Sequence, residues 1–72
     1  MKVSQFTKRE LYHFQAFCNF TPDEEQLFQL RSMGKTLEEC AEIMNVSDST
    51  AKRIQKRMKR KIETEQRQMT LY

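Results

Sequence analysis

Three segments of the sequence begin with a threonine that is followed three residues later by a glutamate. The pairs are Thr7 and Glu10, Thr21 and Glu24, and Thr36 and Glu39. In such a capping box the threonine hydroxyl accepts a backbone N–H of the first helical turn, and the glutamate accepts the threonine N–H. Three of these signals, with one Gly, one Pro and no sustained β-strand alternation, predict an all-α domain.

Four helices account for the start signals and the apolar spacing of the 72 residues. We expect these helices at about 8–18, 22–33, 37–44 and 48–65. Pro22 suits the first position of the second helix, and Gly34 ends that helix in a left-handed conformation. The chain therefore reads as one domain over 1–65, followed by a frayed C-terminal tail over 66–72.

Apolar residues at helical spacing predict the inward face of each helix. These are Leu11, Phe14, Phe17 and Cys18; Leu27, Phe28 and Leu30; Leu37, Cys40, Ala41, Ile43 and Met44; and Ala51, Ile54, Met58 and Ile62. A core this small is marginal, so a partner chain is a second option. Met58, Ile62 and Met69 lie on one stripe that could pair with the fourth helix of a second copy, and Tyr12 of the first helix could also contact a second copy. The alternative for Met58 and Ile62 is packing on the first helix of the same chain.

The third and fourth helical segments are joined by a sequence typical of a tight turn, in "LEECAEIMNVSDSTAKRIQKRMKRKI". Asn45 tolerates a positive φ, Val46 is apolar enough to lie under the turn, and Ser47 can cap the next helix. Ala41 supplies a small side chain where the helices cross. These features predict a helix-turn-helix.

Positive charge is concentrated in the last segment. Residues 1–50 carry five basic and eight acidic side chains, whereas residues 51–72 carry eight basic and two acidic ones. Seven of the basic residues lie between Lys52 and Lys61, with no acid among them. A solvated helix usually interleaves acids, and a membrane-surface helix needs a bulkier apolar face. The pattern thus favours nucleic acid as the partner over these two alternatives.

The stretch from Phe20 to Ile62 resembles the helix-turn-helix domains of LuxR/GerE-type regulators and the −35-reading domain of bacterial sigma factors. Those families share a Thr-Pro or Leu-Pro start and a core "E-I-A-E-x-[LM]-x-[VC]-S-x-x-T-V-K-R", which here reads "EECAEIMNVSDSTAKR". Cys40, Asn45 and Ala51 replace the usual Ile, Gly and Val. The resemblance implies DNA binding and transcription regulation.

In a helix-turn-helix the leading turns of the second helix reach base edges in the major groove. The face opposite the apolar stripe predicts base contacts from Ser49, Thr50, Lys52, Arg53 and Lys56. Residues at helix starts or further along the basic helix are expected to contact phosphates. These are Lys35, Thr36, Ser47, Arg57, Lys59 and Arg60, with Lys61 beside them. Asp48 either stabilises the start of its helix, at the positive end of the helix dipole, or accepts a hydrogen bond from a cytosine amine.

Other chemistry is not indicated. His13 is the single histidine and we expect it on the surface; with no CxxC motif, the sequence predicts no metal, no cofactor and no enzymatic activity. Cys18 and Cys40 fall at apolar helical positions, which favours buried reduced thiols over a disulfide. We expect neither a signal peptide nor a membrane span, and hence a cytoplasmic protein.

We therefore expect a small bacterial or phage transcriptional regulator that binds a specific double-stranded DNA sequence, as a monomer or a homodimer. One alternative is a sigma-like adapter whose basic helix meets an acidic groove of RNA polymerase or of another regulator. Another is the DNA-binding subunit of a phage or mobile-element machine.

Overall fold

The computed structural model describes the backbone of residues 3–69 and the side chains of residues 3–68. A short 3-10 helix, η1 (Val3–Gln5), precedes four α-helices, and no strand occurs in this part of the chain. The α-helices are α1 (Lys8–Phe17), α2 (Pro22–Ser32), α3 (Leu37–Met44) and α4 (Asp48–Met69). The all-α, four-helix prediction is confirmed, and the bounds of the first three helices agree with it to within one residue.

The end of α4 differs from the prediction, because the helix continues past residue 65 to Met69. Residues 66–69, expected in the frayed tail, are thus helical, while 70–72 lie outside the described residues. Packing of α1 against the far end of α4 explains the difference. There His13 Nε2 lies 2.8 Å from Glu65 Oε1, so His13 is half-buried in a contact between helices rather than on the open surface.

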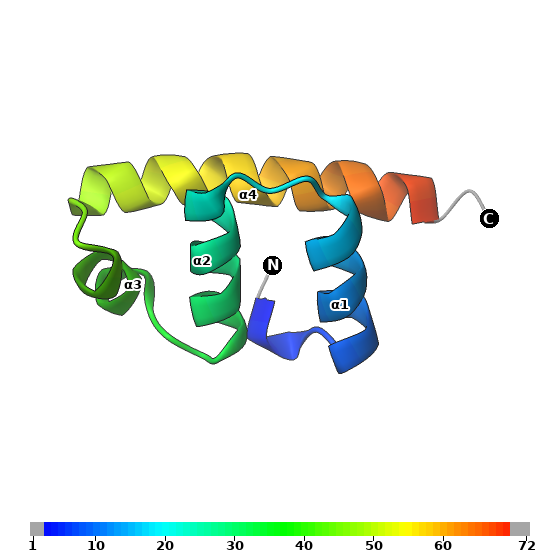
Figure 1. Ribbon diagram of the computed structural model, residues 1–72, viewed down its shortest axis with the longest axis horizontal. Helices are drawn as coiled ribbons and strands as arrows, with labels where there is room; N and C mark the ends of the chain where they lie inside the picture. The colour runs from blue at the N-terminus through cyan, green and yellow to red at the C-terminus, as the bar shows by residue number, and fades with distance from the viewer. Residues whose placement is uncertain (1–2, 70–72) are drawn as a thin grey trace.

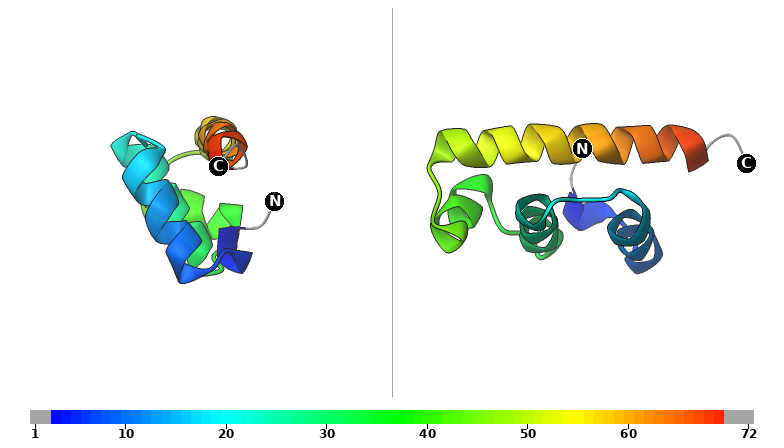
Figure 2. Two further views of the ribbon diagram at one scale, coloured as in Figure 1. Left: turned by 90° about the vertical axis from the view of Figure 1, so that its right-hand side faces the viewer. Right: turned by 45° about the horizontal axis from the view of Figure 1, so that its top comes forward.

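The helix α4 forms one side of the molecule, and α1, α2 and α3 lie side by side along it (Figure 1). At 1.5 Å per residue its 22 residues span about 33 Å, most of the 39 Å longest dimension. The view along this axis places the other helices on one side of α4 (Figure 2). This arrangement leaves the opposite side of α4 uncovered by any other described helix.

The helices start at the capping residues that the sequence predicts, and α2 and α3 end at the predicted left-handed residues. All three Thr/Glu capping boxes are formed, and Ser47 Oγ accepts the backbone N–H of Thr50 at 3.2 Å. Gly34 ends α2 with φ 87°, and Asn45 ends α3 with φ 58° and ψ 47°. The N–H of Val46 donates to the carbonyl of Ala41 at 3.0 Å, which completes a Schellman-type turn. The chain therefore breaks at Asn45 and restarts as α4.

The core lies between α4 and the three shorter helices. Its buried cluster comprises Val3, Phe14, Cys18, Leu27, Phe28, Cys40, Ile54, Met58 and Ile62. Met58 and Ile62 are fully buried within the one chain, so they are not available to pair with a second copy. Packing within the same chain is therefore confirmed for Met58 and Ile62, whereas the side chain of Met69 lies outside the described residues.

Two residues predicted to face inward are exposed instead. Phe17, which is 64% exposed, is the last residue of α1 and is turned about 100° from the buried Cys18 that follows it. Ile43 is 52% exposed and lies on α3, a helix of only eight residues. Its side chain is turned about 100° from that of the next residue, Met44, which packs against the core. Helical spacing alone overestimated the width of both inward faces.

Both cysteines are free, buried thiols, as predicted. Burial raises the pKa of Cys18 to about 11, with a further increase from the charge of Glu65 that Lys61 partly opposes. The Cys18 thiol donates to the Lys61 carbonyl at 3.7 Å. Burial also raises the pKa of Cys40. Both groups are therefore protonated at neutral pH, which makes them poor nucleophiles.

Candidate nucleic-acid interface

A shallow surface groove runs along the outer face of α4. It is lined by Arg53, Lys56, Arg57 and Arg60 and has a volume of about 410 Å³; we refer to it as the cationic groove. All four side chains are exposed. Within the described part of the chain, Arg53, Lys56 and Arg60 form no ion pair and no side-chain hydrogen bond. Their donors are therefore available to a ligand.

The leading turn of α4 presents part of the predicted base-contacting set. Ser49 and Lys52 are exposed, on the same helix face as the cationic groove or at its margin. Thr50 is half-buried, and its hydroxyl oxygen accepts from the Ser47 hydroxyl at 2.9 Å. The Ser47 hydroxyl thus caps α4 and is also hydrogen-bonded to the Thr50 hydroxyl. Ser49, Lys52, Arg53 and Lys56 are the freer members of the set.

Lys61 has a structural contact that the basic run did not reveal. Its Nζ donates to Glu24 Oε1 at 2.5 Å and to the carbonyl of Asn19 at 3.1 Å. Asn19 has a positive φ of 54° in the connection between α1 and α2. Lys61 therefore ties α4 to the start of α2, and its charge is largely neutralised. Lys59, next to Arg60, is half-buried.

Glu24 is a buried carboxylate, 1% exposed, at the other end of this contact. Burial by itself raises its pKa, but hydrogen bonds from Lys61 and from the Thr21 N–H, with the nearby charges of Lys61 and Arg57, lower it overall. Glu24 is thus ionised at neutral pH. The capping role of Glu24 is visible in the sequence, whereas its cation lies 37 residues away and is visible only in the fold.

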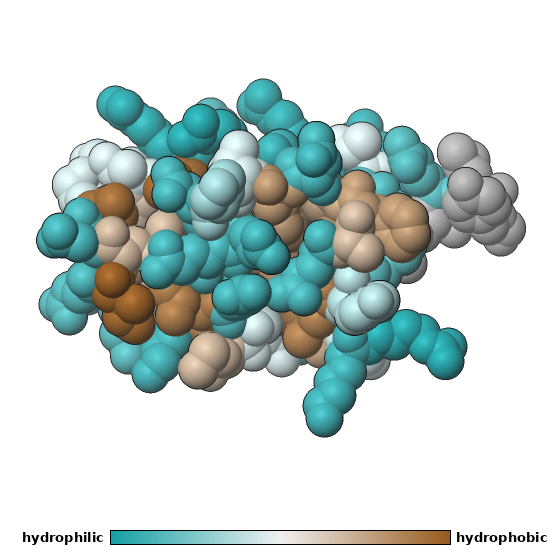
Figure 3. All heavy atoms as spheres, in the orientation of Figure 1, coloured by the Kyte–Doolittle hydropathy of each residue, from teal (hydrophilic) through white to brown (hydrophobic). Residues whose placement is uncertain are grey.

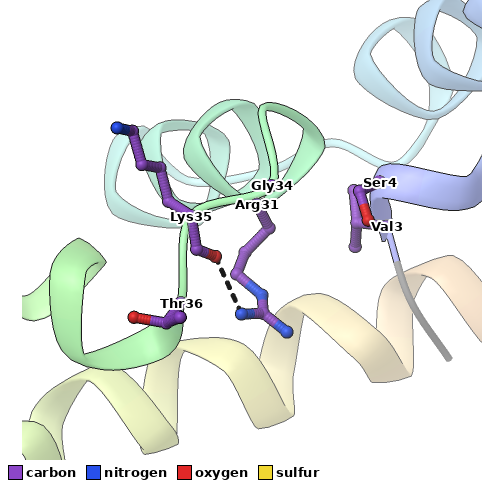
Figure 4. Close-up of a pocket in the computed structure, with 6 residues that line it drawn as sticks. All are labelled: Val3, Ser4, Arg31, Gly34, Lys35 and Thr36. Atoms are coloured by element: carbon purple, nitrogen blue, oxygen red, sulfur yellow. Dashed lines mark hydrogen bonds between the residues drawn. The ribbon is translucent and has the colours of Figure 1, made fainter.

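Lys35 and Thr36 lie in a separate concavity, between η1 and the connection from α2 to α3 (Figure 4). Arg31 Nη1 donates to the Lys35 carbonyl at 2.9 Å, while the Lys35 ammonium extends away from α4. The Thr36 hydroxyl accepts from the Glu39 N–H at 3.2 Å. This cap, with the hydrogen bond from the Thr36 N–H foremost, lowers the pKa of Glu39. These two predicted phosphate contacts do not line the cationic groove.

The two helices of the predicted helix-turn-helix expose opposite charge. Glu38, Glu39 and Glu42 are exposed on α3, whereas the outer face of α4 is basic from Lys52 to Arg60. Asp48 at the start of α4 is also exposed. An anionic ligand is therefore attracted to α4 and repelled by the outer side of α3.

Three further findings are negative. No helix in residues 3–69 is long and apolar enough to cross a membrane, and the described side chains contain no group of three or more His, Cys, Asp or Glu residues that could hold a metal ion. Comparisons with protein-family models, curated proteins and solved structures find no significant match to this chain.

Proposed function

We propose that the protein is a helix-turn-helix that binds double-stranded DNA through the outer face of α4, with the acidic outer side of α3 turned away from the DNA, and acts as a small transcriptional regulator. The observation that carries this proposal is the outer face of α4. It holds three exposed cations, Arg53, Lys56 and Arg60, that have no partner among the described residues, on a helix whose opposite face is packed into the core. The sequence resemblance to LuxR/GerE-type and sigma-factor domains supports the same assignment.

Docking follows from the dimensions of the two partners. An α-helix with its side chains is about 10–12 Å wide, close to the roughly 12 Å width of the DNA major groove. Ser49, Lys52 and Arg53 on the leading turns would lie nearest the base edges, and Arg53 can bind guanine through two donors. Arg57 and Arg60, further along, would bind phosphates and set the orientation.

The packed face of α4 prepares the outer face for binding. Ala51, Ile54, Met58 and Ile62 are buried, and Lys61 adds a polar anchor to α2. Because these contacts hold α4 in one rotation about its axis, little conformational freedom of the backbone has to be lost when DNA binds. The protein would act in the cytoplasm of a bacterium or its phage. A homodimer would add a second half-site.

Fluorescence anisotropy of a labelled duplex over a salt series tests this proposal. Arg53→Ala with Lys56→Ala should weaken binding at least about 10-fold and reduce the magnitude of the log K against log salt slope by about 2. The control is Lys8→Ala with Arg9→Ala, which removes the same charge from exposed positions of α1. Equal losses in both variants would contradict groove docking.

Selection of bound sequences from a random duplex pool tests the regulatory part. A specific site should emerge, and a palindrome with half-sites about 10 base pairs apart would indicate a dimer. A pool that shows no enrichment would leave only non-specific binding, which is more typical of a phage or mobile-element DNA-binding subunit.

A second candidate function is a protein adapter that docks on RNA polymerase or another regulator. The exposed Ile43 of α3, which follows Glu42 and lies one helical turn after Glu39, favours it, since exposed apolar area rimmed by polar residues is typical of protein interfaces. Failure to bind any duplex at 50 mM salt, combined with retention by purified polymerase, would favour the adapter over the regulator.

A further inference from the structure

The cationic groove does not end at Arg60. A second pocket of about 260 Å³ adjoins it, lined by Phe17, Cys18, Arg60, Lys61 and Thr64. Arg60 lines both concavities, so the surface is continuous from the leading half of α4 to the end of α1. The molecular surface shows an apolar area near the end of α1, bordered by hydrophilic side chains (Figure 3). We refer to this second concavity as the aromatic pocket.

Phe17 is exposed but held in place. The ring centroids of Phe17 and His13 are 4.7 Å apart with an interplanar angle of 33°, so the histidine covers one side of the phenyl ring. His13 in turn contacts Glu65 of α4 at 2.8 Å. With 64% of the residue still exposed, Phe17 offers an apolar face of defined orientation to the pocket.

The polar groups of the aromatic pocket differ in availability. Lys61 is engaged by Glu24 and Asn19, and the Cys18 thiol donates to the Lys61 carbonyl. Arg60 has no side-chain partner among the described residues. Thr64 Oγ1 donates to the Arg60 carbonyl at 3.0 Å and keeps its capacity to accept. The groups available to a ligand are therefore the aromatic face of Phe17, the guanidinium of Arg60 and the hydroxyl oxygen of Thr64 as an acceptor.

We propose that the aromatic pocket binds an unstacked nucleobase of a single-stranded segment that flanks the duplex. Phe17 stacks on the base, and Arg60 binds the adjoining phosphate. A nucleic acid fits better than an acidic peptide because the cations at 53, 56, 57 and 60 recur at every helical turn, about 5 Å apart, and lead directly to the ring. The inference rests on the proposed function, since the duplex part occupies the cationic groove.

A tryptophan reporter tests the stacking directly, because the chain contains no Trp. The F17W variant is titrated with a hairpin duplex, blunt or with an extension of about four nucleotides at its 5′ or 3′ end. Indole emission should be quenched by one extended hairpin and unchanged by the blunt one. The wild type should bind that extended hairpin about 5-fold or more tightly than the blunt one.

Two further variants separate the ring from general effects. Phe17→Leu keeps an apolar side chain but removes the aromatic face, so it should lose the preference for the extension and keep the affinity for the blunt duplex. Tyr12→Leu removes a ring that is 75% exposed on the same helix and does not line the pocket, so it should keep the preference. Far-ultraviolet circular dichroism confirms that each variant is helical.

The outcomes distinguish this inference from the proposed function. Equal wild-type affinity for blunt and extended hairpins overturns the inference and leaves duplex binding intact. Quenching of F17W by an acidic peptide with one aromatic residue, without quenching by oligonucleotides, also overturns it and assigns the pocket to a protein. Quenching by single strands in a protein that binds no duplex supports the pocket and rejects the proposed duplex function.

Discussion

The inner and outer faces of α4 differ in how far their side chains are buried and in how many partners they have. On the inner face, Ala51, Ile54, Met58 and Ile62 are buried among side chains of the other helices. On the outer face, the cations of the groove are exposed, and most have no partner among the described residues. The inner face therefore supplies the stability of the fold, while the outer face contributes little to it and is free to bind.

Arg60 and Lys61 show this difference between two adjacent residues of the same charge. One residue along a helix turns the side chain by about 100°. That rotation places Arg60 in both surface concavities and places Lys61 against the buried carboxylate of Glu24. A run of basic residues is thus not one functional unit, because part of it serves the fold.

The largest expected effect is on the inner face. Met58→Ala should lower the free energy of unfolding by about 2–5 kcal/mol, since it removes a fully buried side chain and leaves a cavity. Lys56→Ala on the outer face should change it by less than about 0.5 kcal/mol. Urea denaturation followed by circular dichroism measures both. Similar losses in the two variants would remove the distinction between the faces.

Substitution of Lys61 and Arg60, one at a time, tests whether only Lys61 of this pair supports the fold. Lys61→Met should destabilise by about 1–2 kcal/mol, because Glu24 is left buried without its cation. The expected loss is below that of a fully buried pair, since the Lys61 side chain is 34% exposed and partly screened. Arg60→Met is the matched control and should be nearly neutral in the same urea titration. The reverse order would show that Arg60 carries the structural contact.

The turn between α3 and α4 should show an effect of about 1 kcal/mol. Asn45 has φ 58°, a conformation that Ala adopts only at a cost of roughly 1–2 kcal/mol and that Gly adopts freely. Asn45→Ala should therefore be destabilising, whereas Asn45→Gly should be neutral or slightly stabilising by thermal unfolding. If Asn45→Ala were as stable as the parent, the left-handed turn would not constrain how α3 and α4 meet.

The smallest effect is expected in mild acid. The pKa of Glu24 is below its usual 4.5 in the folded chain because its hydrogen bonds and neighbouring cations outweigh burial, and that of Glu39 is lowered by its cap. Such carboxyls stabilise the fold above their unfolded pKa, and this contribution is lost as pH falls through the folded pKa. Urea midpoints should be constant near pH 7 and fall below about pH 4.5. Lys61→Met should reduce the fall, because Glu24 then loses its main reason to stay ionised.

Helix starts and ends could be predicted because they depend on residues within one turn of each other. The Thr/Glu caps, the left-handed Gly34 and the break at Asn45 all follow from contacts of five residues or fewer along the chain. The buried stripe of α4 follows from the same local periodicity. These features are determined by the sequence itself, since backbone sterics and hydrogen bonding act over that short range.

The tertiary structure decided which of the predicted functional residues are available. Lys61 is withdrawn from the basic surface by a residue 37 positions away, and Lys35 lies in a different concavity. Phe17, expected in the core, instead lines the aromatic pocket beside Arg60. Contacts over such separations depend on how the helices pack against α4, and the periodicity of one helix contains no information about the surface that another helix brings to it.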